Sequence, residues 1–394
     1  MISLKEAQQL VNQQARSFGK EIVLLDDAVG RVLNEPVIAD RDYPPFNRAT
    51  MDGIAINSAD WNDGVRSYTI AETIFAGMIA TRSISKGECY KIMTGAAVPA
   101  SADTVIRKED LSENENRLTV TVSEIKQGQN IAMMGSDIKK GIAVINSSQI
   151  IKEGTITTLA SLGYDEVKVA SLPSVAIITT GDEIVSVHAP VNEVQIRNSN
   201  QHLLKALLRR WEIKPTAVAH VKDNAATLLQ AVNKCKQNDI IILSGAVSAG
   251  DADFVPEVLI LAGAKMIFHK VAIRPGKPIW FGKFENGPVV FALPGNPFST
   301  FVTFKLFIEE FLFACFALPE RKMLQLPFKG NRIKKTNLDE FFPVMLSGNP
   351  TVVNPIAFNT SGDITAVTMA DALAMQQTDK MEINQDELVS CFIV

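Results

Sequence analysis

The sequence has few residues of the kinds that build metal clusters or disulfide frameworks. Only four cysteines and four histidines occur in 394 residues, and each stands far from the others of its kind. This isolation argues against a clustered zinc site, a disulfide framework and a histidine-based triad. It indicates unpaired thiols in a reducing cytoplasm.

Excess positive charge and long apolar runs are also lacking. The formal net charge is −4 and the basic residues are scattered, which argues against a nucleic-acid partner. No apolar run has the length of a membrane span, and the first residues lack the build of a signal peptide. Ser3 and Glu6 instead have the capping-box spacing of a helix start. With 46% hydrophobic and 21% charged residues, we expect a soluble cytoplasmic protein.

The chain is too long for one ordinary core, and its patterning changes along its length. Residues 1–170 are predicted to be a β-rich region, with helical linker parts at about 1–35 and 150–165. Residues 171–322 alternate strand and helix patterns, which predicts a doubly wound α/β domain. Residues 323–394 return to short strands and turns, typical of a small C-terminal β domain. The predicted fold class is therefore α/β plus β.

The most informative segment runs from Asp239 to Asp253. The apolar run Ile240 to Leu243 predicts a strand that is buried on both faces. A loop of small residues follows, at the end of a strand where open α/β sheets bind their ligands. Small residues let a ligand approach the backbone, whose N–H groups can hold an anion. The loop residues expected to contact substrate are Ser244, Gly245, Ser248 and Gly250.

Acidic residues gather at the predicted ends of three neighbouring strands. They are Glu183, Asp223, Asp251 and Asp253. Each alone could cap a helix or shape a turn, but four exceed what turns need. Carboxylates alone would repel an anionic substrate, so we predict a Mg²⁺ site formed by these four residues.

Two further loops follow strand-like runs in the same domain. The first, Arg274-Pro-Gly-Lys277-Pro, supplies two positive charges. The second is Leu293-Pro-Gly-Asn-Pro297, in which Pro294 and Asn296 are expected to contact substrate. Three shaped loops after three strands of one α/β domain predict a single binding site.

The N-terminal region contributes two weaker signals. Asp52 precedes Gly53 after a proline-rich loop, and a turn aspartate bonded to its own backbone is the simpler interpretation of that residue alone. Thr94 and Gly95 follow a strand-like run and could offer a hydroxyl and backbone donors to a phosphate. Such loops are common, so neither motif identifies a site by itself.

Taken together, these loops resemble the molybdopterin molybdenumtransferase family, which includes MoeA and the E domain of gephyrin. The resemblance extends over about residues 1–380, with the motifs in the family's order. The matching segments are Ala49–Ala55, Ile92–Ala96, Asn130–Ile138, Thr180–Glu183, Ser244–Asp253, Arg274–Pro278 and Leu293–Pro297.

The resemblance implies a four-part, elongated subunit in a homodimer, whose active site lies between the N-terminal β-rich part of one subunit and the α/β domain of the other. It implies a magnesium-dependent reaction of adenylylated molybdopterin with molybdate that gives molybdenum cofactor and AMP. A molybdopterin adenylyltransferase and apo-molybdoenzymes are then candidate partners. By position, catalytic roles fall to Asp52, Asp137, Asp223, Asp253 and Lys277. Arg274 and Ser361 are assigned to substrate binding.

Three positions depart from the family's usual residues. Ala132 replaces an arginine, Ala246 a glycine and Arg274 a lysine. These departures keep open a non-catalytic scaffold that binds molybdopterin or its product, or a paralogue with reduced insertion activity. An adenylyltransferase of the same pathway needs only the α/β domain, so the other regions argue against it. A Rossmann dehydrogenase is disfavoured because no Gly-x-Gly-x-x-Gly opens the domain.

Overall fold

The computed structural model describes residues 1–114, 117–245 and 254–394. The chain forms two compact units, each with its own hydrophobic cores. The first unit comprises Met1–Asn34, Ser148–Glu153 and Glu166–Val394. The second comprises Glu35–Ser147 and Gly154–Asp165. In the described residues no helix combines the length and apolarity that crossing a membrane requires.

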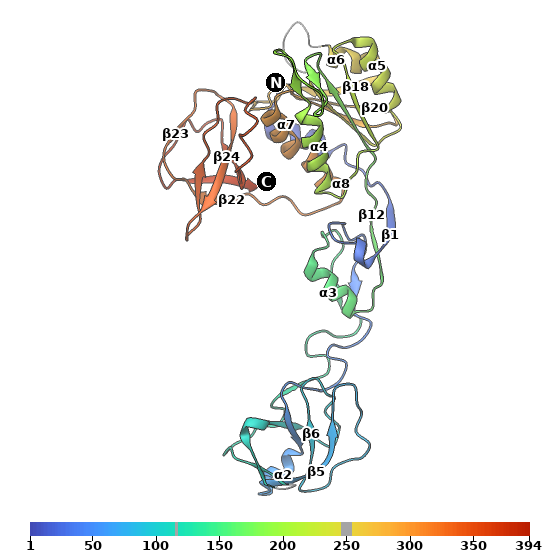
Figure 1. Ribbon diagram of the computed structural model, residues 1–394, viewed down its shortest axis with the longest axis vertical. Helices are drawn as coiled ribbons and strands as arrows, with labels where there is room; N and C mark the ends of the chain where they lie inside the picture. The colour runs from blue at the N-terminus through green and yellow to red at the C-terminus, as the bar shows by residue number, and fades with distance from the viewer. Residues whose placement is uncertain (115–116, 246–253) are drawn as a thin grey trace. The chain divides into compact units, whose positions relative to one another are not determined.

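A six-stranded mixed sheet forms the centre of the first unit (Figure 1). Its strands, in spatial order, are β16 (Ala217–Val221), β13 (Val175–Thr180), β17 (Ile240–Ser244), β21 (Val289–Leu293), β20 (Trp280–Phe284) and β18 (Ala264–His269). The first four strands pair in parallel, and β20 pairs antiparallel with both β21 and β18. β13, β17 and β21 are buried throughout, as continuous apolar runs predict for parallel strands. The sequence patterns did not predict β18.

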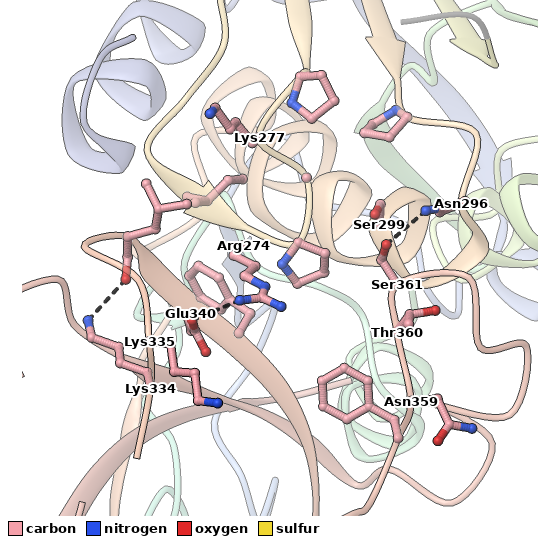
Figure 2. Close-up of a pocket in the computed structure, with 18 of the residues that line it drawn as sticks. Arg274, Lys277, Asn296, Ser299, Lys334, Lys335, Glu340, Asn359, Thr360 and Ser361 are labelled. Atoms are coloured by element: carbon pink, nitrogen blue, oxygen red, sulfur yellow. Dashed lines mark hydrogen bonds and ion pairs between the residues drawn. The ribbon is translucent and has the colours of Figure 1, made fainter. Parts of the chain in front are cut away.

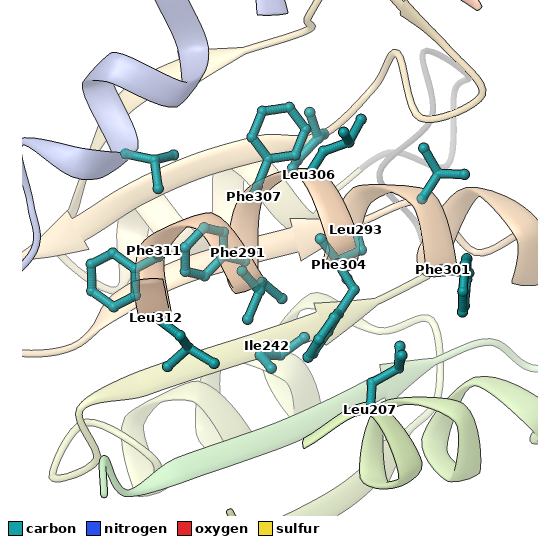
Figure 3. Packing of buried hydrophobic residues seen from close by; sticks show 14 of the residues in the cluster. Leu207, Ile242, Phe291, Leu293, Phe301, Phe304, Leu306, Phe307, Phe311 and Leu312 are labelled. Carbon is teal, nitrogen blue, oxygen red and sulfur yellow. The ribbon is translucent and has the colours of Figure 1, made fainter. Parts of the chain in front are cut away.

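Helices cover both faces of this sheet, which confirms the doubly wound arrangement. Ile177, Ile242 and Phe291 lie side by side in β13, β17 and β21 and face one helical layer. The residue that follows each of them faces the other layer, because side chains alternate along a strand. The first layer contains α1 (Leu4–Asn12), α4 (Ser199–Arg209), α7 (Pro297–Thr303) and α8 (Glu309–Cys315). The second layer contains α5 (Ala225–Lys234) and α6 (Val255–Leu261). Figure 3 shows the aromatic packing of the first layer against the sheet.

The last long helix of the α/β domain is interrupted. The sequence predicts one helix from Phe298 to Phe316, but the π-helical turn η3 (Phe304–Ile308) separates α7 from α8. Hydrophobic periodicity does not reveal a single π-turn, because the apolar residues on either side still face the same core.

The C-terminal sheet belongs to the same compact unit. Its strands, in order, are β19 (Ile273–Arg274), β24 (Asp339–Ser347), β26 (Ala372–Gln376), β28 (Leu388–Ile393) and β22 (Leu324–Pro327), with β25 (Val352–Pro355) beside β24. β19 comes from the α/β domain and pairs in parallel with β24, through Arg274 opposite Glu340. This pairing brings the Arg274 loop against the C-terminal β domain. Two short strands, β23 (Arg332–Ile333) and β27 (Glu382–Ile383), pair beside it.

The second unit contains the predicted β-rich region. Its sheet has the order β7 (Thr104–Arg107), β4 (Gly53–Ile56), β6 (Glu88–Ile92), β5 (Ser67–Ile74), β9 (Arg117–Val120) and β8 (Leu111–Asn114). Smaller pairs join β2 (Val37–Ile38) to β11 (Ala143–Ile145) and β3 (Arg48–Ala49) to β10 (Ile131–Ala132). The unit also contains α2 (Ser58–Asn62) and most of α3 (Glu153–Ser161), after which Gly163 has the expected left-handed φ of +80°.

The local structure predicted from the sequence is confirmed at some positions and wrong at others. The Ser3 hydroxyl accepts the Glu6 N–H at 3.2 Å and caps α1, which ends at Asn12 rather than near residue 18. Between residues 20 and 33 the first ordered element is β1 (Lys20–Leu24), which pairs with β12 (Glu166–Ala170). The sequence predicts a polar hairpin turn at residues 112–116, but the described residues 112–114 form part of β8 (Leu111–Asn114) instead.

Candidate functional site

A cavity lies in the first unit, between the α/β domain and the C-terminal β domain (Figure 2). Its volume is about 840 Å³. It brings together five residues that the sequence placed in the site, although they come from three separate segments of the chain. These are Arg274, Lys277, Pro294, Asn296 and Ser361.

The loop after β19 supplies one cationic wall. Arg274 and Lys277 are exposed, and Lys277 has no ion-pair partner among the described residues. Arg274 lies 3.6 Å from the Glu340 carboxylate, too far for a tight hydrogen bond. Gly276 has φ +107°, and a Cβ there would lie 2.5 Å from the Thr303 methyl group. The glycine therefore lets this loop pack closely on α7.

The C-terminal β domain supplies a second cationic wall, at β23 and the residues after it, that the sequence analysis missed. Arg332, Lys334 and Lys335 all line the cavity. Arg332 is held by Glu340 at 2.8 Å, by Gln376, and by the Phe342 ring 4.2 Å away. The sequence feature that corresponds to this wall is the basic run Arg332-Ile-Lys-Lys335. No long apolar, strand-like run directly precedes it.

Lys334 is a buried cation without a carboxylate within ion-pair distance among the described residues. Its ammonium donates to the carbonyl of Leu338 at 3.0 Å and to that of Gln377, and only 3% of the residue is exposed. Burial lowers the pKa of Lys334 despite nearby acids. Neutral carbonyls do not cancel its charge, so the protonated lysine adds positive potential to this wall.

Asn296 of the α/β domain and Ser361 of the C-terminal β domain are in direct contact in the lining of the cavity. The Asn296 amide donates to the Ser361 hydroxyl at 2.8 Å, and the Phe298 N–H donates to the Ser361 carbonyl at 3.1 Å. The Phe298 and Phe358 rings make an edge contact beneath them. Both predicted polar residues are therefore fixed at the start of α7, where Asn296 is the N-cap residue.

The small-residue loop after β17 is only partly described. The Ser244 hydroxyl is buried, and it accepts from the Asn200 amide at 2.9 Å and lies 3.4 Å from the Thr300 hydroxyl. It is thus a structural group inside the protein, not a group at the cavity surface. Gly245 is required at its position, since a Cβ would lie 2.5 Å from the Thr180 carbonyl oxygen. Ala246, Ser248, Gly250, Asp251 and Asp253 lie outside the described residues.

Two of the four acids predicted to bind metal are described. Partial burial and the charges of Glu183 and Asp182 raise the pKa of Asp223, so these carboxylates lie close enough to repel one another. Asp223 also donates its backbone N–H to Asp182 at 3.3 Å. Within the described parts of the chain, no three His, Cys, Asp or Glu side chains are grouped to hold a metal ion.

In the second unit, Asp52 and Thr94 form a direct contact. The Thr94 N–H and hydroxyl donate to one Asp52 oxygen at 2.8 and 2.7 Å, and these bonds lower the pKa of Asp52. Asp52 therefore stays ionised at neutral pH, and it lines a cavity of about 340 Å³ with Lys91 and Lys108.

The other predicted residues of this unit lie on loops. Gly95 has φ +88°, and its N–H donates to the Ala49 carbonyl rather than pointing outward. Asp137 is exposed and accepts from the Ser136 hydroxyl at 3.2 Å. Ala132, which departs from the family pattern, pairs with Arg48 in β10 and β3.

The main cavity is lined mostly by positively charged side chains. Five cationic side chains line it, with Glu340 as the acid among its lining residues. Guanidinium and ammonium groups of this kind bind phosphate-like oxygens, and a partly enclosed site strengthens that attraction. The hydroxyl and amide groups of Ser361 and Asn296 add hydrogen-bond partners for a polar ligand.

Two family models match the chain. The model described as "MoeA N-terminal region (domain I and II)" matches residues 2–163, and "Probable molybdopterin binding domain" matches residues 176–314. A crystal structure titled as the molybdopterin biosynthesis moeA protein of Pyrococcus horikoshii OT3 is 26% identical, covers 100% of both chains and superposes with a TM-score of 0.85.

Curated relatives agree with the structural match. The molybdopterin molybdenumtransferase of Staphylococcus epidermidis is 33% identical over 387 residues, covering 95% of this chain and 91% of that protein. The Staphylococcus aureus protein of the same name is 33% identical over 386 residues, with the same coverage. The chain therefore belongs to the molybdopterin molybdenumtransferase family, a family of transferases of molybdenum cofactor biosynthesis.

Proposed function

We propose that this protein inserts molybdate into adenylylated molybdopterin and releases AMP. The observation that carries this proposal is the cavity of about 840 Å³, whose cations come from both the α/β domain and the C-terminal β domain. Both reactants are anions, molybdate as an oxyanion and the pterin substrate through its pyrophosphate. A predominantly cationic cavity matches that chemistry.

Within the cavity, the proposed roles follow from side-chain chemistry. Arg274, Lys277 and Arg332 hold the molybdate oxygens, because their charges face the same space from two walls. Asn296 and Ser361 orient the ligand through their amide and hydroxyl groups. Arg274 offers a planar fork in place of the usual lysine, which favours binding two oxygens at once.

The Mg²⁺ requirement is proposed from the carboxylates at the ends of β13 and β16. Glu183 and Asp223 offer the oxygen donors that Mg²⁺ prefers, and burial together with the charges of Glu183 and Asp182 raises the pKa of Asp223. Glu183 and Asp223 would hold the ion with Asp251 and Asp253, and bound Mg²⁺ would act as a Lewis acid toward phosphate oxygens. Asp52 and Asp137 remain proposed catalytic residues from the second unit.

Sequence resemblance supports a homodimer in which the two subunits complete each other's sites, and we include it in the proposal. Mixing an Asp52→Asn subunit with a Lys277→Gln subunit tests it directly. If sites are shared, mixed dimers regain one intact site and therefore part of the activity of the wild-type protein. No recovery in verified mixed dimers would argue against sharing.

The insertion reaction is tested by AMP release from adenylylated molybdopterin. We expect release only when molybdate and Mg²⁺ are both present. Lys277→Gln removes a charge that faces the cavity, so we expect at least about a tenfold loss in kcat/KM, the effect of about 1.4 kcal/mol of lost binding. Lys265→Gln is the matched control, because Lys265 pairs with Glu285 on an exposed surface of the same domain.

The same assay separates the transferase from the scaffold that Ala132 and Ala246 keep open. Absence of AMP release from folded protein, together with tight binding of molybdopterin or its product, would establish the scaffold instead. AMP release that is indifferent to molybdate would contradict both interpretations.

A further inference from the structure

Arg321 joins the α/β domain to the C-terminal sheet from a position outside the lining of the main cavity. Its guanidinium lies 3.0 Å from the Glu309 carboxylate and donates to the Lys305 carbonyl at 3.1 Å. It also donates to the Ile393 carbonyl at 3.2 Å and lies 4.2 Å from the centre of the Phe392 ring. One planar side chain thus contacts α8, η3 and β28.

The π-helical turn is the feature on which these contacts converge. The Leu306 carbonyl in η3 accepts from Gln8 of α1 at 3.1 Å, just as the Lys305 carbonyl accepts from Arg321. A π-turn disturbs the regular helical hydrogen bonds and is frequent at functional sites. Here it serves as the anchor for two segments that are remote in sequence.

Charge makes the anchor specific for a cation at position 321. The Glu309 side chain is 5% exposed, and the Lys305 ammonium lies 2.6 Å from it. Burial lowers the pKa of Lys305 to about 8, so this lysine loses its positive charge at alkaline pH. An arginine keeps its charge there. Among the described residues, removal of Arg321 leaves the buried Glu309 carboxylate with Lys305 as its one ion-pair partner.

A continuous set of contacts leads from Arg321 to the cavity. Phe392 packs on Phe341 with ring centroids 6.3 Å apart, and Phe341 lines the cavity. The adjacent Glu340 binds Arg332 at 2.8 Å and lies 3.6 Å from Arg274. β28, which carries Phe392, and β24, which carries Phe341 and Glu340, are both hydrogen-bonded to β26.

We infer that Arg321 is a positioning residue for the reaction, which holds the C-terminal sheet against η3 and α8 and so sets the spacing of the two cationic walls. The inference rests on the proposed function, because it assumes that an oxyanion binds between those walls. An oxyanion touched from both sides is sensitive to small changes in that spacing, since a hydrogen bond weakens steeply with distance and angle.

The test uses the full-length protein and molybdate alone, with binding followed by calorimetry. We expect Arg321→Gln to raise the Kd for molybdate about 3- to 10-fold, within the range known for residues that act without touching the ligand. In the AMP-release assay, the KM for molybdate should rise by a similar factor while kcat changes less than about twofold.

Two further variants keep the test decisive. Arg321→Lys retains a positive charge for Glu309, so the variant should fold normally. It lacks the planar guanidinium that contacts the oxygens of Glu309, Lys305 and Ile393 together, so it should still weaken molybdate binding. Phe392→Leu interrupts the next contact and should act in the same direction. Lys322→Gln, which changes an exposed neighbour in the same linker, should bind molybdate as the wild type does.

The outcomes distinguish this inference from the proposed function. Molybdate binding to folded Arg321→Lys and Phe392→Leu with the wild-type Kd would overturn the positioning role alone. Failure of the wild-type protein to bind molybdate or release AMP would remove the proposed function and this inference with it. A fall in kcat with an unchanged KM for molybdate would also contradict positioning.

Discussion

At the residue scale, the same kinds of side chain behave differently according to their partners. Lys334 is buried and donates to carbonyls, whereas Lys335, the next residue in the chain, is exposed at the cavity. Their charges act together on a ligand, but only Lys334 also holds backbone segments in place. Replacement of Lys334 would therefore perturb both the fold and the site, which makes Lys277 the cleaner probe of charge.

Asp52 offers a similarly clean test in the second unit. Asparagine keeps an oxygen that can accept both hydrogen bonds from Thr94, but it removes the charge that these bonds stabilise. We expect Asp52→Asn to lower kcat for AMP release at least about 100-fold, as for loss of a catalytic group, with little change in the unfolding midpoint.

Asp63→Asn is the control for that variant, since Asp63 is an exposed carboxylate paired with Lys86 in the same unit. Equal activity of the Asp52→Asn and Asp63→Asn proteins would remove Asp52 from the catalytic set. Loss of activity that accompanies loss of the folded state would instead assign Asp52 a structural role.

At the scale of elements, close approach between paired strands explains why the first residue of β4 is a glycine. A Cβ at Gly53 would lie 1.8 Å from the Ile106 carbonyl oxygen in β7. Backbone atoms of paired strands cannot move aside as a flexible side chain can. Gly53 is thus needed for the pairing that places Asp52 directly before the first residue of β4.

We therefore expect Gly53→Ala to destabilise the second unit by about 3 kcal/mol, the upper part of the range for overpacking. Chemical unfolding followed by circular dichroism measures this change. Gly154→Ala is the matched control, because Gly154 lies in α3 and a Cβ there meets nothing within 4 Å. A wild-type midpoint for Gly53→Ala would show that β4 and β7 are not paired as described.

The elements also show which sequence signals were sufficient. Continuous apolar runs predicted β13, β17 and β21 because strands buried on both faces need apolar side chains throughout. β18 alternates buried and exposed residues irregularly at the sheet edge, so its pattern was not recognisable. The π-turn in the last helix was missed because it leaves the apolar periodicity intact on both sides.

At the scale of the whole molecule, the chain divides into two compact units with separate cores. Chains with more than one domain commonly depart from a single two-state transition. We expect calorimetry to show two heat-absorption transitions, and core variants to move them separately. Leu312→Ala, which truncates a fully buried residue of the first unit, should cost about 2–5 kcal/mol and lower only one transition.

Gly53→Ala should lower the other transition, which gives a reciprocal control within one experiment. A single transition that both variants shift equally would show that the two units unfold as one. Either result bears on stability alone and leaves the assignment of the cavity unchanged.

The sequence by itself determined the family, the α/β and β classes, and the loops that carry Arg274, Lys277 and Asn296. It could do so because apolar periodicity and loop chemistry are local properties of the chain. Only the tertiary structure decided that Ser361, Arg332 and Lys334 line one cavity with those loops, and that the Ser244 hydroxyl is buried. Those facts depend on β19 pairing with β24 and on packing between segments remote in sequence, which no local pattern encodes.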